Sequence, residues 1–178
     1  MKVRPFRVGD EAALLGVFRS AVHQIASRDY SAEQVEAWAP ADLRVEEFGD
    51  RVRRNRPFVA ILGLEPVGFA DLQSDGRIDQ FFVSGYLPRR GTARLLMDRI
   101  EEEAAGLGLK QLTSHVSLTA EPFFASRGFH VAERCHPVLR GVTFENALMR
   151  KALTGGQPGR LPAERSAKLA AVLRLRLG

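Results

Sequence analysis

A glycine-containing turn joins an apolar run to a long helical segment, and this junction has the make-up of a phosphate-binding site. The run RIDQFFV (77–83) is followed by the loop SGYLPRRGTA (84–93) and the helical segment RLLMDRIEEE (94–103). Such a turn directs several backbone N–H groups at one point, and the helix dipole adds to their attraction for an anion. The spacing fits neither a P-loop nor a dinucleotide-binding turn, so those two classes are not supported.

A second segment, LTAEPFFASRGF (118–129), places neighbouring aromatic residues inside a short predicted helix. We expect this helix to begin with Thr119 as its cap, to carry Pro122 in its first turn and to end at Gly128.

The two segments together resemble the signatures of the GCN5-related N-acetyltransferase (GNAT) superfamily. The acetyl-CoA loop of that family reads [QR]-x-x-G-x-[GA], and residues 88–93 match its second half. The second signature, A-x-x-[LF]-[YF]-x-x-x-G-F, is matched by Ala120, Phe123, Phe124, Gly128 and Phe129. Further segments are similar to a bacterial subgroup described as YafP-like acetyltransferases: SRDYSAEQVEAWAP, GFADLQ and RGVTFENALMRK. The resemblance covers about residues 2–151 and implies acetyl transfer from acetyl-CoA to an amine.

The resemblance assigns cofactor binding to the loop and the helix that follows it. Acetyl-CoA would be held by main-chain donors of Arg89, Arg90, Gly91, Thr92, Ala93 and Arg94, with charge from Arg89 or Arg90. Pro88 stands where the family has Gln or Arg, and it removes one backbone donor. Ser117 stands where many members have an Asn that contacts the pantetheine arm, and its side chain has a shorter reach.

Phe124 occupies the position where many members carry a Tyr that protonates the departing CoA thiolate. Either another group supplies that proton (Tyr30, Tyr86 or water), or the thiolate takes up the proton lost by the amine. We favour the second alternative, because a thiol with a reference pKa of about 8.5 gives a fair leaving group without help. We expect Phe124 to pack beside the CoA sulfur.

The attacking amine must be neutral, so the site needs a proton acceptor or a water chain. Regular strand alternation would put Asp79 on the same face as Val83, and Asp79 is therefore the first choice as base or amine anchor, with an ion pair as its structural alternative. Asp71 on the preceding strand is a second choice. His115 is a third, because imidazole exchanges protons near neutral pH.

The resemblance also implies a main-chain N–H on the cofactor strand that faces the acetyl oxygen, supplied by Val83 or its neighbour Phe82. Tyr30 and Trp38 would lie over the acceptor end. For both residues, a substrate wall and ordinary core packing remain alternatives.

The elements that position these residues alternate between strands and helices. Asp10 is a plausible cap for the first helix, and Ser31 with Gln34 has the form of a capping box. Strands are predicted at 2–8, 58–64, 67–73, 77–83, 111–117, 129–138 and 142–151, and helices at 11–26, 31–38, 45–55, 92–106 and 119–128. The prediction is an α/β GNAT fold: a mixed, mostly antiparallel sheet of about seven strands flanked by about four helices.

One GNAT domain is expected over residues 1–153, followed by a basic tail over 154–178 that is flexible or forms a short helix. The chain has 178 residues and a formal charge of +5, but residues 155–178 hold five cations and one acid. The body is therefore close to neutral, which argues against a nucleic-acid-binding face. A nucleic-acid role of the tail stays a minor alternative.

We expect a cytoplasmic protein without a membrane segment, because no apolar run approaches the length of a span. Cys135 is the only cysteine, and no metal is expected. The expected partner is a small-molecule or peptide amine, and monomer and homodimer both remain open. The alternative function is a non-catalytic acetyl-CoA-binding regulatory module, which would tolerate the departures at Pro88, Ser117 and Phe124.

Overall fold

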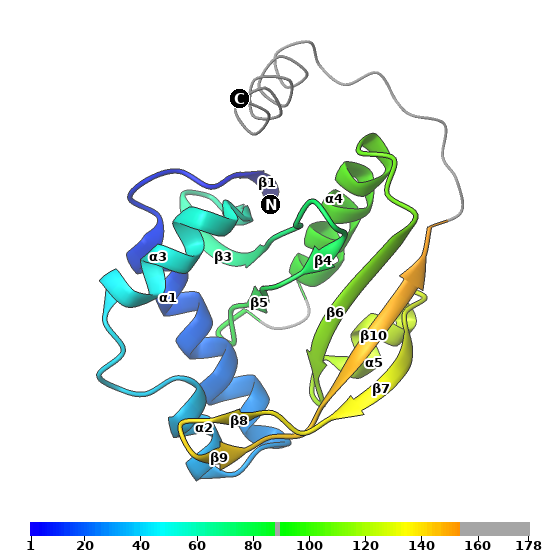
Figure 1. The fold of residues 1–178 in the computed structure, drawn as a ribbon. Coiled ribbons are helices and arrows are strands. Elements are labelled where there is room, and N and C mark those ends of the chain that lie inside the picture. Colours follow the sequence, from blue (N-terminus) through cyan, green and yellow to red (C-terminus); the bar gives the residue numbers. More distant parts are fainter. Residues whose placement is uncertain (88–89, 154–178) are drawn as a thin grey trace, which may run out of the picture.

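The computed structural model describes residues 1–87 and 90–153, which form two four-stranded sheets, a small hairpin and flanking helices (Figure 1). Pro88, Arg89 and the tail (154–178) lie outside the described residues, as do the predictions made for them. Among the described residues, no helix is long and apolar enough to cross a membrane.

The first sheet is antiparallel throughout, and its strands follow the order β1-β2-β3-β5. These strands are β1 (Lys2–Pro5), β2 (Phe58–Leu62), β3 (Glu65–Ala70) and β5 (Phe81–Val83). The strand β5 forms one edge of this sheet.

The second sheet is mixed, with the order β4-β6-β10-β7. Its strands are β4 (Arg77–Ile78), β6 (Gln111–Ser117), β7 (His130–Cys135) and β10 (Asn146–Ala152). The β4–β6 pair is parallel, and the other two pairs are antiparallel. A hairpin of β8 (Val138–Leu139) and β9 (Val142–Thr143) extends from this sheet.

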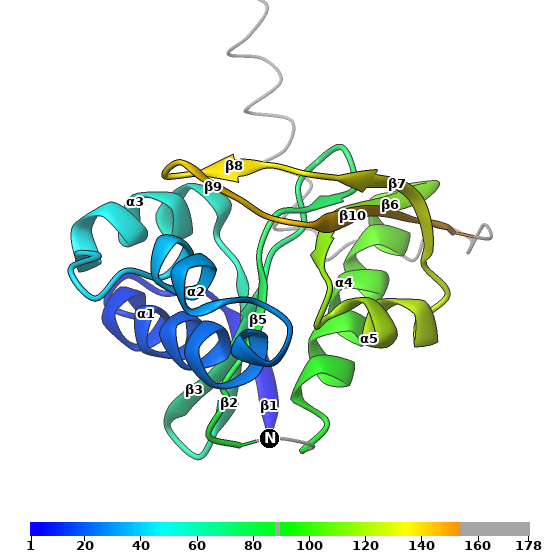
Figure 2. The ribbon, with the colours of Figure 1, turned by 90° about the horizontal axis from the view of Figure 1, so that it is seen from below.

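Five α-helices are described: α1 (Glu11–Ser20), α2 (Ala32–Trp38), α3 (Val45–Asn55), α4 (Thr92–Gly106) and α5 (Glu121–Ser126). A π-helical turn, η1 (Ala21–Ile25), and a 3-10 turn, η2 (Ala26–Arg28), continue α1. Figure 2 shows the first sheet between the layer of α1, α2 and α3 on one side and α4 on the other. The predicted α/β architecture is confirmed.

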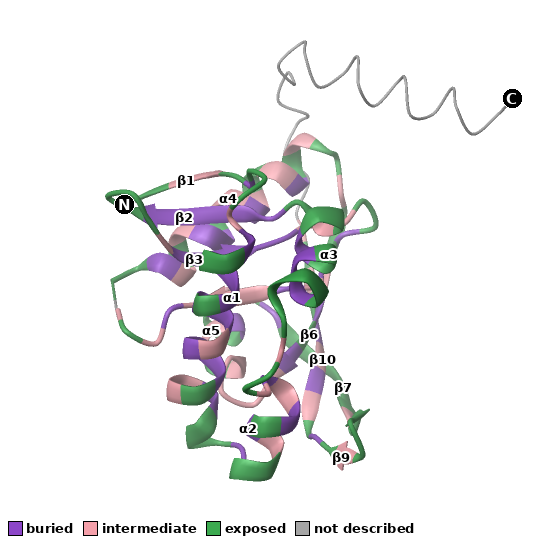
Figure 3. Ribbon diagram, turned by 90° about the vertical axis from the view of Figure 1, so that its left-hand side faces the viewer, coloured by how far each residue is buried: buried purple, intermediate pink, exposed green. Residues whose placement is uncertain are grey.

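Strand alternation divides the interior into two cores. In β2, Val59 and Ile61 pack with α1 and α3, whereas Phe58 and Ala60 pack with α4. The strand is buried over nearly its whole length (Figure 3). A strand covered on both faces reads as a continuous apolar run, and FVAIL has this pattern.

Three of the seven predicted strands are each interrupted, which gives ten shorter strands. The run 77–83 is broken at Asp79 and Gln80, between β4 and β5, and the two pieces belong to different sheets. The last two predicted strands are broken in the same way into β7 with β8 and β9 with β10. The two breaks around the hairpin allow β8 and β9 to leave the second sheet and to lie near α2 (Figure 2).

The predicted helix caps are partly corrected. The capping box of Ser31 and Gln34 is present. Asp10 precedes α1 but makes no side-chain cap, because its carboxylate forms a 2.7 Å ion pair with Arg4. Thr119 does not cap α5 either, since its hydroxyl donates to Asp29 Oδ2 at 2.6 Å and the cap position is Ala120.

Candidate functional site

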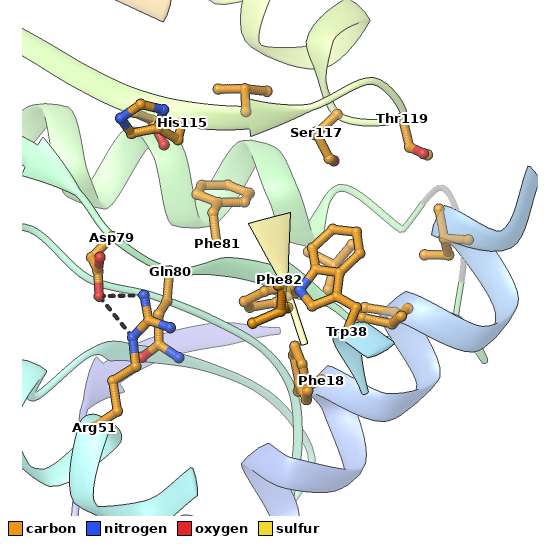
Figure 4. A pocket seen from close by; sticks show the side chains of 18 of the residues that line it. Phe18, Trp38, Arg51, Asp79, Gln80, Phe81, Phe82, His115, Ser117 and Thr119 are labelled. Atoms are coloured by element: carbon orange, nitrogen blue, oxygen red, sulfur yellow. Dashed lines mark hydrogen bonds and ion pairs between the residues drawn. The ribbon is translucent and has the colours of Figure 1, made fainter. Parts of the chain in front are cut away.

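A cavity of about 750 Å³ lies where the two sheets separate. The strand β4 pairs with β6 as far as Ile78 and Ser114, and beyond that point β5 pairs with β3. The end of β6 and the strand β5 therefore form opposite walls, with His115 and Ser117 on one and Phe82 on the other (Figure 4). The volume is that of a small-molecule or cofactor site.

One edge of β5 has backbone groups that face the cavity rather than a neighbouring strand. Ser84 N donates to Val67 O, and Asp71 N donates to Gln80 O, so the even-numbered residues of this segment bond to β3. Backbone groups alternate in direction along a strand, so the N–H of Val83 points to the opposite edge, where the sheets have separated. Of the two residues expected from the sequence as main-chain donors, Val83 is therefore the one whose N–H points away from β3.

The start of α4 borders the same cavity through Ala93. Gly91 is the N-cap residue, with a φ of 79°, and no side chain of the described residues caps this helix. Thr92 is buried, whereas Arg90 and Arg94 are exposed, with Arg94 3.9 Å from Asp98. The first turn of α4 thus offers uncapped N–H groups and small side chains beside the cavity, which is the arrangement that favours an anion.

Ser117 and Phe124 also line the cavity, next to the start of α4. Phe124 is 2% exposed and makes edge contacts with Phe81, Phe123 and Phe129 at ring distances of 5.0–5.8 Å. The two residues that the family signatures assign to cofactor binding therefore line the same cavity.

The opposite end of the cavity is an aromatic chamber formed by Phe18, Trp38, Phe48 and Phe82. Phe82 contacts Phe18 edge-on at 4.9 Å and Trp38 at 6.4 Å (Figure 4). The π-helical turn η1 contributes Ala21, Val22 and Ile25 to the same wall, and such turns recur at functional sites.

Tyr30, expected in this wall, does not line the cavity. Its hydroxyl donates to Glu145 O at 2.6 Å and accepts from Leu118 N at 3.0 Å, so it ties η2 to two strand ends. Burial raises its pKa. Tyr86, the other tyrosine, is 73% exposed and also lies outside the lining.

Asp79 lines the cavity but is surrounded by donors. Its carboxylate accepts hydrogen bonds from Arg51 at 2.8–2.9 Å, from Asn55 at 2.7 Å and from Arg77. Burial raises the pKa of Asp79, but the bonds from Asn55 and Arg51 and the charges of Arg51 and Arg77 outweigh burial and lower it overall. Because the strand is broken at this residue, Asp79 turns toward α3 and does not share a face with Val83, contrary to the alternation expected from the sequence.

Asp71 and His115 occupy different surroundings. Asp71 is fully buried behind Asp79, outside the cavity lining, and accepts from Asp79 N and Asn55 Nδ2 at 2.8 Å. Burial raises the pKa of Asp71. His115 lines the cavity from β6, and its ring forms no hydrogen bond or ion pair with the described residues.

Sequence reasoning missed six polar residues of the lining: Glu47, Arg51, Gln80, Ser114, Thr119 and Arg140. Gln80 is 3% exposed, and its Oε1 has no partner among the described residues. Its polar side chain inside the apolar run RIDQFFV was the available signal. Arg51 and Arg140 gave no such signal, because they come from segments 28 and 61 residues away from Asp79 along the sequence numbering.

The cavity thus lies between one edge of β5, the start of α4 and an aromatic chamber, and the comparisons show that the chain is an acyltransferase. A family model described as an acetyltransferase (GNAT) domain matches residues 26–146. The Escherichia coli (strain K12) protein described as uncharacterized N-acetyltransferase YafP is 32% identical over 150 residues, which are 84% of this chain and 95% of that protein. The chain belongs to the GNAT family, as its sequence motifs indicated.

Solved structures agree with this assignment. A crystal structure described as a GCN5-related N-acetyltransferase, aminotransferase class-II, from Rhodopseudomonas palustris matches with a TM-score of 0.81 and 33% identity, over 85% of this chain and 94% of that one. The PaiA N-acetyltransferase from Thermoplasma acidophilum, solved in complex with coenzyme A, matches with a TM-score of 0.67 and 16% identity, over 85% and 98%. The second likeness shows the shared fold. Among the described residues, no group of three His, Cys, Asp or Glu residues is placed to hold a metal ion.

Proposed function

We propose that this chain transfers an acetyl group from acetyl-CoA to a primary amine of a small molecule or a peptide, by direct attack of the amine in a ternary complex. The observation that carries the proposal is the continuous cavity from the start of α4, along the free edge of β5, to the aromatic chamber. Coenzyme A in the T. acidophilum neighbour and acetyl-CoA in the Salmonella typhimurium protein yncA, a fold neighbour, support the choice of cofactor.

The residues at the cofactor end fit acetyl-CoA. The N–H groups of Thr92, Ala93 and Arg94 would hold the pyrophosphate, because no described side chain caps them and Gly91 leaves open space before them. Ser117 and Phe124 would contact the pantetheine arm. When bound, acetyl-CoA supplies an activated thioester.

The N–H of Val83 would donate to the oxygen that gains negative charge during the reaction. A donor fixed in a strand needs no reorganisation, and removal of a comparable donor costs about 10²–10³ in kcat in other enzymes. The aromatic chamber would exclude water from the approaching amine.

His115 is the proton acceptor that the geometry favours among the three groups expected from the sequence. Asp79 is a weak base in its ring of donors, and Asp71 does not reach the cavity. His115 lines the cavity without a competing partner. Neither tyrosine lines the cavity, so the proton lost by the amine is the natural source for the thiolate, by way of His115 or water.

A thiol-release assay tests the proposal. The full chain is mixed with acetyl-CoA and a panel of polyamines, aminoglycosides, amino acids and peptides with free N-termini, and acetyl-CoA binding is measured by calorimetry. We expect saturable binding and CoA release with at least one class. Binding without release for every amine would instead indicate the regulatory module, and absence of binding would overturn the proposal.

A further inference from the structure

We propose that the acceptor amine carries an anionic group, in its simplest form a carboxylate, that is bound by Arg140 at the acceptor end of the cavity. This inference rests on the proposed function, because it names the class of amine that the same site takes. Arg140 lies in the turn between β8 and β9 and lines the cavity.

The charge of Arg140 is not neutralised by the protein. Its Nη1 donates to Ala37 O at 2.6 Å, and no carboxylate of the described residues lies within ion-pair distance. A guanidinium has five N–H donors in a planar fork that matches a carboxylate, so most of its donors remain for a ligand. The bond to Ala37, at the end of α2, fixes one edge of the fork. Arg51, the other arginine of the lining, is already paired with Asp79.

The backbone at Arg140 is unfavourable for arginine. Arg140 and Gly141 have φ values of 49° and 79° and form a two-residue loop between β8 and β9. Hairpin loops with two positive φ angles favour Asn followed by Gly, because Asn adopts this conformation more readily than other residues with side chains. A strained arginine that faces a cavity is the kind of outlier that points to a functional role.

Charged groups around the acceptor end have a positive balance. The lining residues with their ion-pair partners include four guanidinium groups (Arg44, Arg51, Arg77 and Arg140) and two carboxylates (Glu47 and Asp79). Asp71, the third carboxylate of this region, is fully buried, and burial raises its pKa. An anionic ligand therefore lowers the electrostatic free energy of this end of the cavity, whereas a polycationic amine raises it.

The other residues that line this end of the cavity indicate the polarity of the rest of the ligand. Leu139 lies beside Arg140, is 39% exposed and lines the cavity, and Trp38 and Phe82 face the same space. Apolar and aromatic walls next to one unpaired cation fit a primary amine with an apolar body and a carboxylate. The anion would not be a phosphate of the cofactor, because the β8–β9 hairpin that carries Arg140 lies on the opposite side of the molecule from the start of α4 (Figure 2).

Matched pairs of amines test the inference. L-phenylalanine, L-leucine, L-methionine and 6-aminohexanoate are each compared with their carboxamides by kcat/KM in the thiol-release assay. The carboxamide keeps the amine and the apolar body and removes the charge. We expect at least one acid to be preferred over its amide by about tenfold or more, the effect of one charge-assisted contact.

Two variants assign the preference to Arg140. Arg140→Asn removes the charge and the bond to Ala37 O but supplies the residue that this turn favours, so its melting temperature should change little. Arg56→Asn is the matched control, because Arg56 also has a positive φ, 48°, and does not line this cavity. We expect Arg140→Asn to reduce the preference to about twofold or less and Arg56→Asn to retain it.

The outcomes separate this inference from the proposed function. Equal or faster turnover of the amides, or a preference that survives in Arg140→Asn, overturns the role of Arg140 while acetyl transfer stands. If acetyl-CoA binds but no amine reacts, calorimetry of the CoA-loaded protein with N-acetyl-L-phenylalanine and its amide decides. The inference is supported if the wild-type protein binds the acid but not the amide and Arg140→Asn no longer binds the acid. It is overturned if the wild-type protein binds both equally or binds neither. Failure of acetyl-CoA itself to bind contradicts the proposed function.

Discussion

The two ends of the cavity are built in different ways. The proposed cofactor end is lined by main-chain groups and small side chains from two short stretches, the turn into α4 and the turn from β6 into α5. The proposed acceptor end is lined by side chains from α1, α2, α3, β5 and the β8–β9 hairpin. A main-chain donor does not depend on the identity of its side chain, so the proposed cofactor end would tolerate departures such as Phe124. Each side chain at the proposed acceptor end would instead affect which amine binds.

The largest effect on kcat is expected from loss of the Val83 N–H, which lies where the two ends of the cavity meet. Val83→Pro removes this donor without removing a ladder bond to β3, and β5 is an edge strand where proline is tolerated. We expect kcat to fall by about 10²–10³. The control Val83→Ala keeps the N–H and should stay within about fivefold. An unchanged kcat in Val83→Pro, measured by thiol release, would remove Val83 from the mechanism.

The next effect concerns proton transfer on the β6 wall. His115→Gln keeps a polar side chain but cannot accept the proton of the amine, and we expect kcat to fall by about 10². If kcat is unchanged in the thiol-release assay, proton transfer runs through water or another group.

The cofactor end is probed by a pair of glycines. Gly91 and Gly108 both have positive φ, 79° and 68°, and an added Cβ at either position would have no atom of residues 1–87 or 90–153 within 4 Å beyond its own chain neighbours. Gly91→Ala and Gly108→Ala therefore carry similar backbone strain. We expect about tenfold weaker acetyl-CoA binding in Gly91→Ala alone, because its Cβ stands before the uncapped N–H groups. If calorimetry gives equal Kd values for acetyl-CoA in the two variants, the pyrophosphate is bound elsewhere than at the start of α4.

A smaller effect on activity is expected at Asp79. Asp79→Asn disrupts the bonds from Arg51, Asn55 and Arg77, so the melting temperature should fall by about 2–4 °C at pH 7, the shift for about 1 kcal/mol in a domain of this size. The pKa of Asp79 is lowered by folding, so its stabilisation is present above the unfolded pKa and is lost as pH falls through the folded pKa.

The difference in melting temperature between Asp79→Asn and wild type should therefore shrink at pH values below about 3.9. We expect kcat/KM to change by less than about fivefold. A fall of kcat/KM by about 10² or more, together with an altered pH profile, would instead indicate that Asp79 is the base or amine anchor in place of His115.

The smallest effect is expected at Phe124. Phe124→Tyr adds a hydroxyl beside the cavity, and the rate should stay within about threefold of wild type because the departing thiolate needs no side-chain acid. A gain of about a hundredfold in kcat would show instead that a missing acid limits turnover.

Local patterns of the sequence determined much of this protein. The turn before α4, the capping box at Ser31 and the aromatic pair of α5 each act over a few residues, so their spacing predicts their structure and, through the family motifs, the acyltransferase class. Ser117 and Phe124, which the same motifs assign to cofactor binding, both line the cavity.

The side chains that line the proposed acceptor end became known only from the tertiary structure. Periodicity predicted one strand over 77–83, but pairing with β3 and β6 in different sheets breaks it at Asp79, and the break turns that carboxylate toward Arg51 and Asn55. Tyr30 does not line the predicted wall, because its hydroxyl is hydrogen-bonded to Glu145 O and Leu118 N. Contacts between residues far apart in the chain cannot be predicted from local spacing, so only the packing of α3, β5 and the β8–β9 hairpin shows which side chains face this end of the cavity.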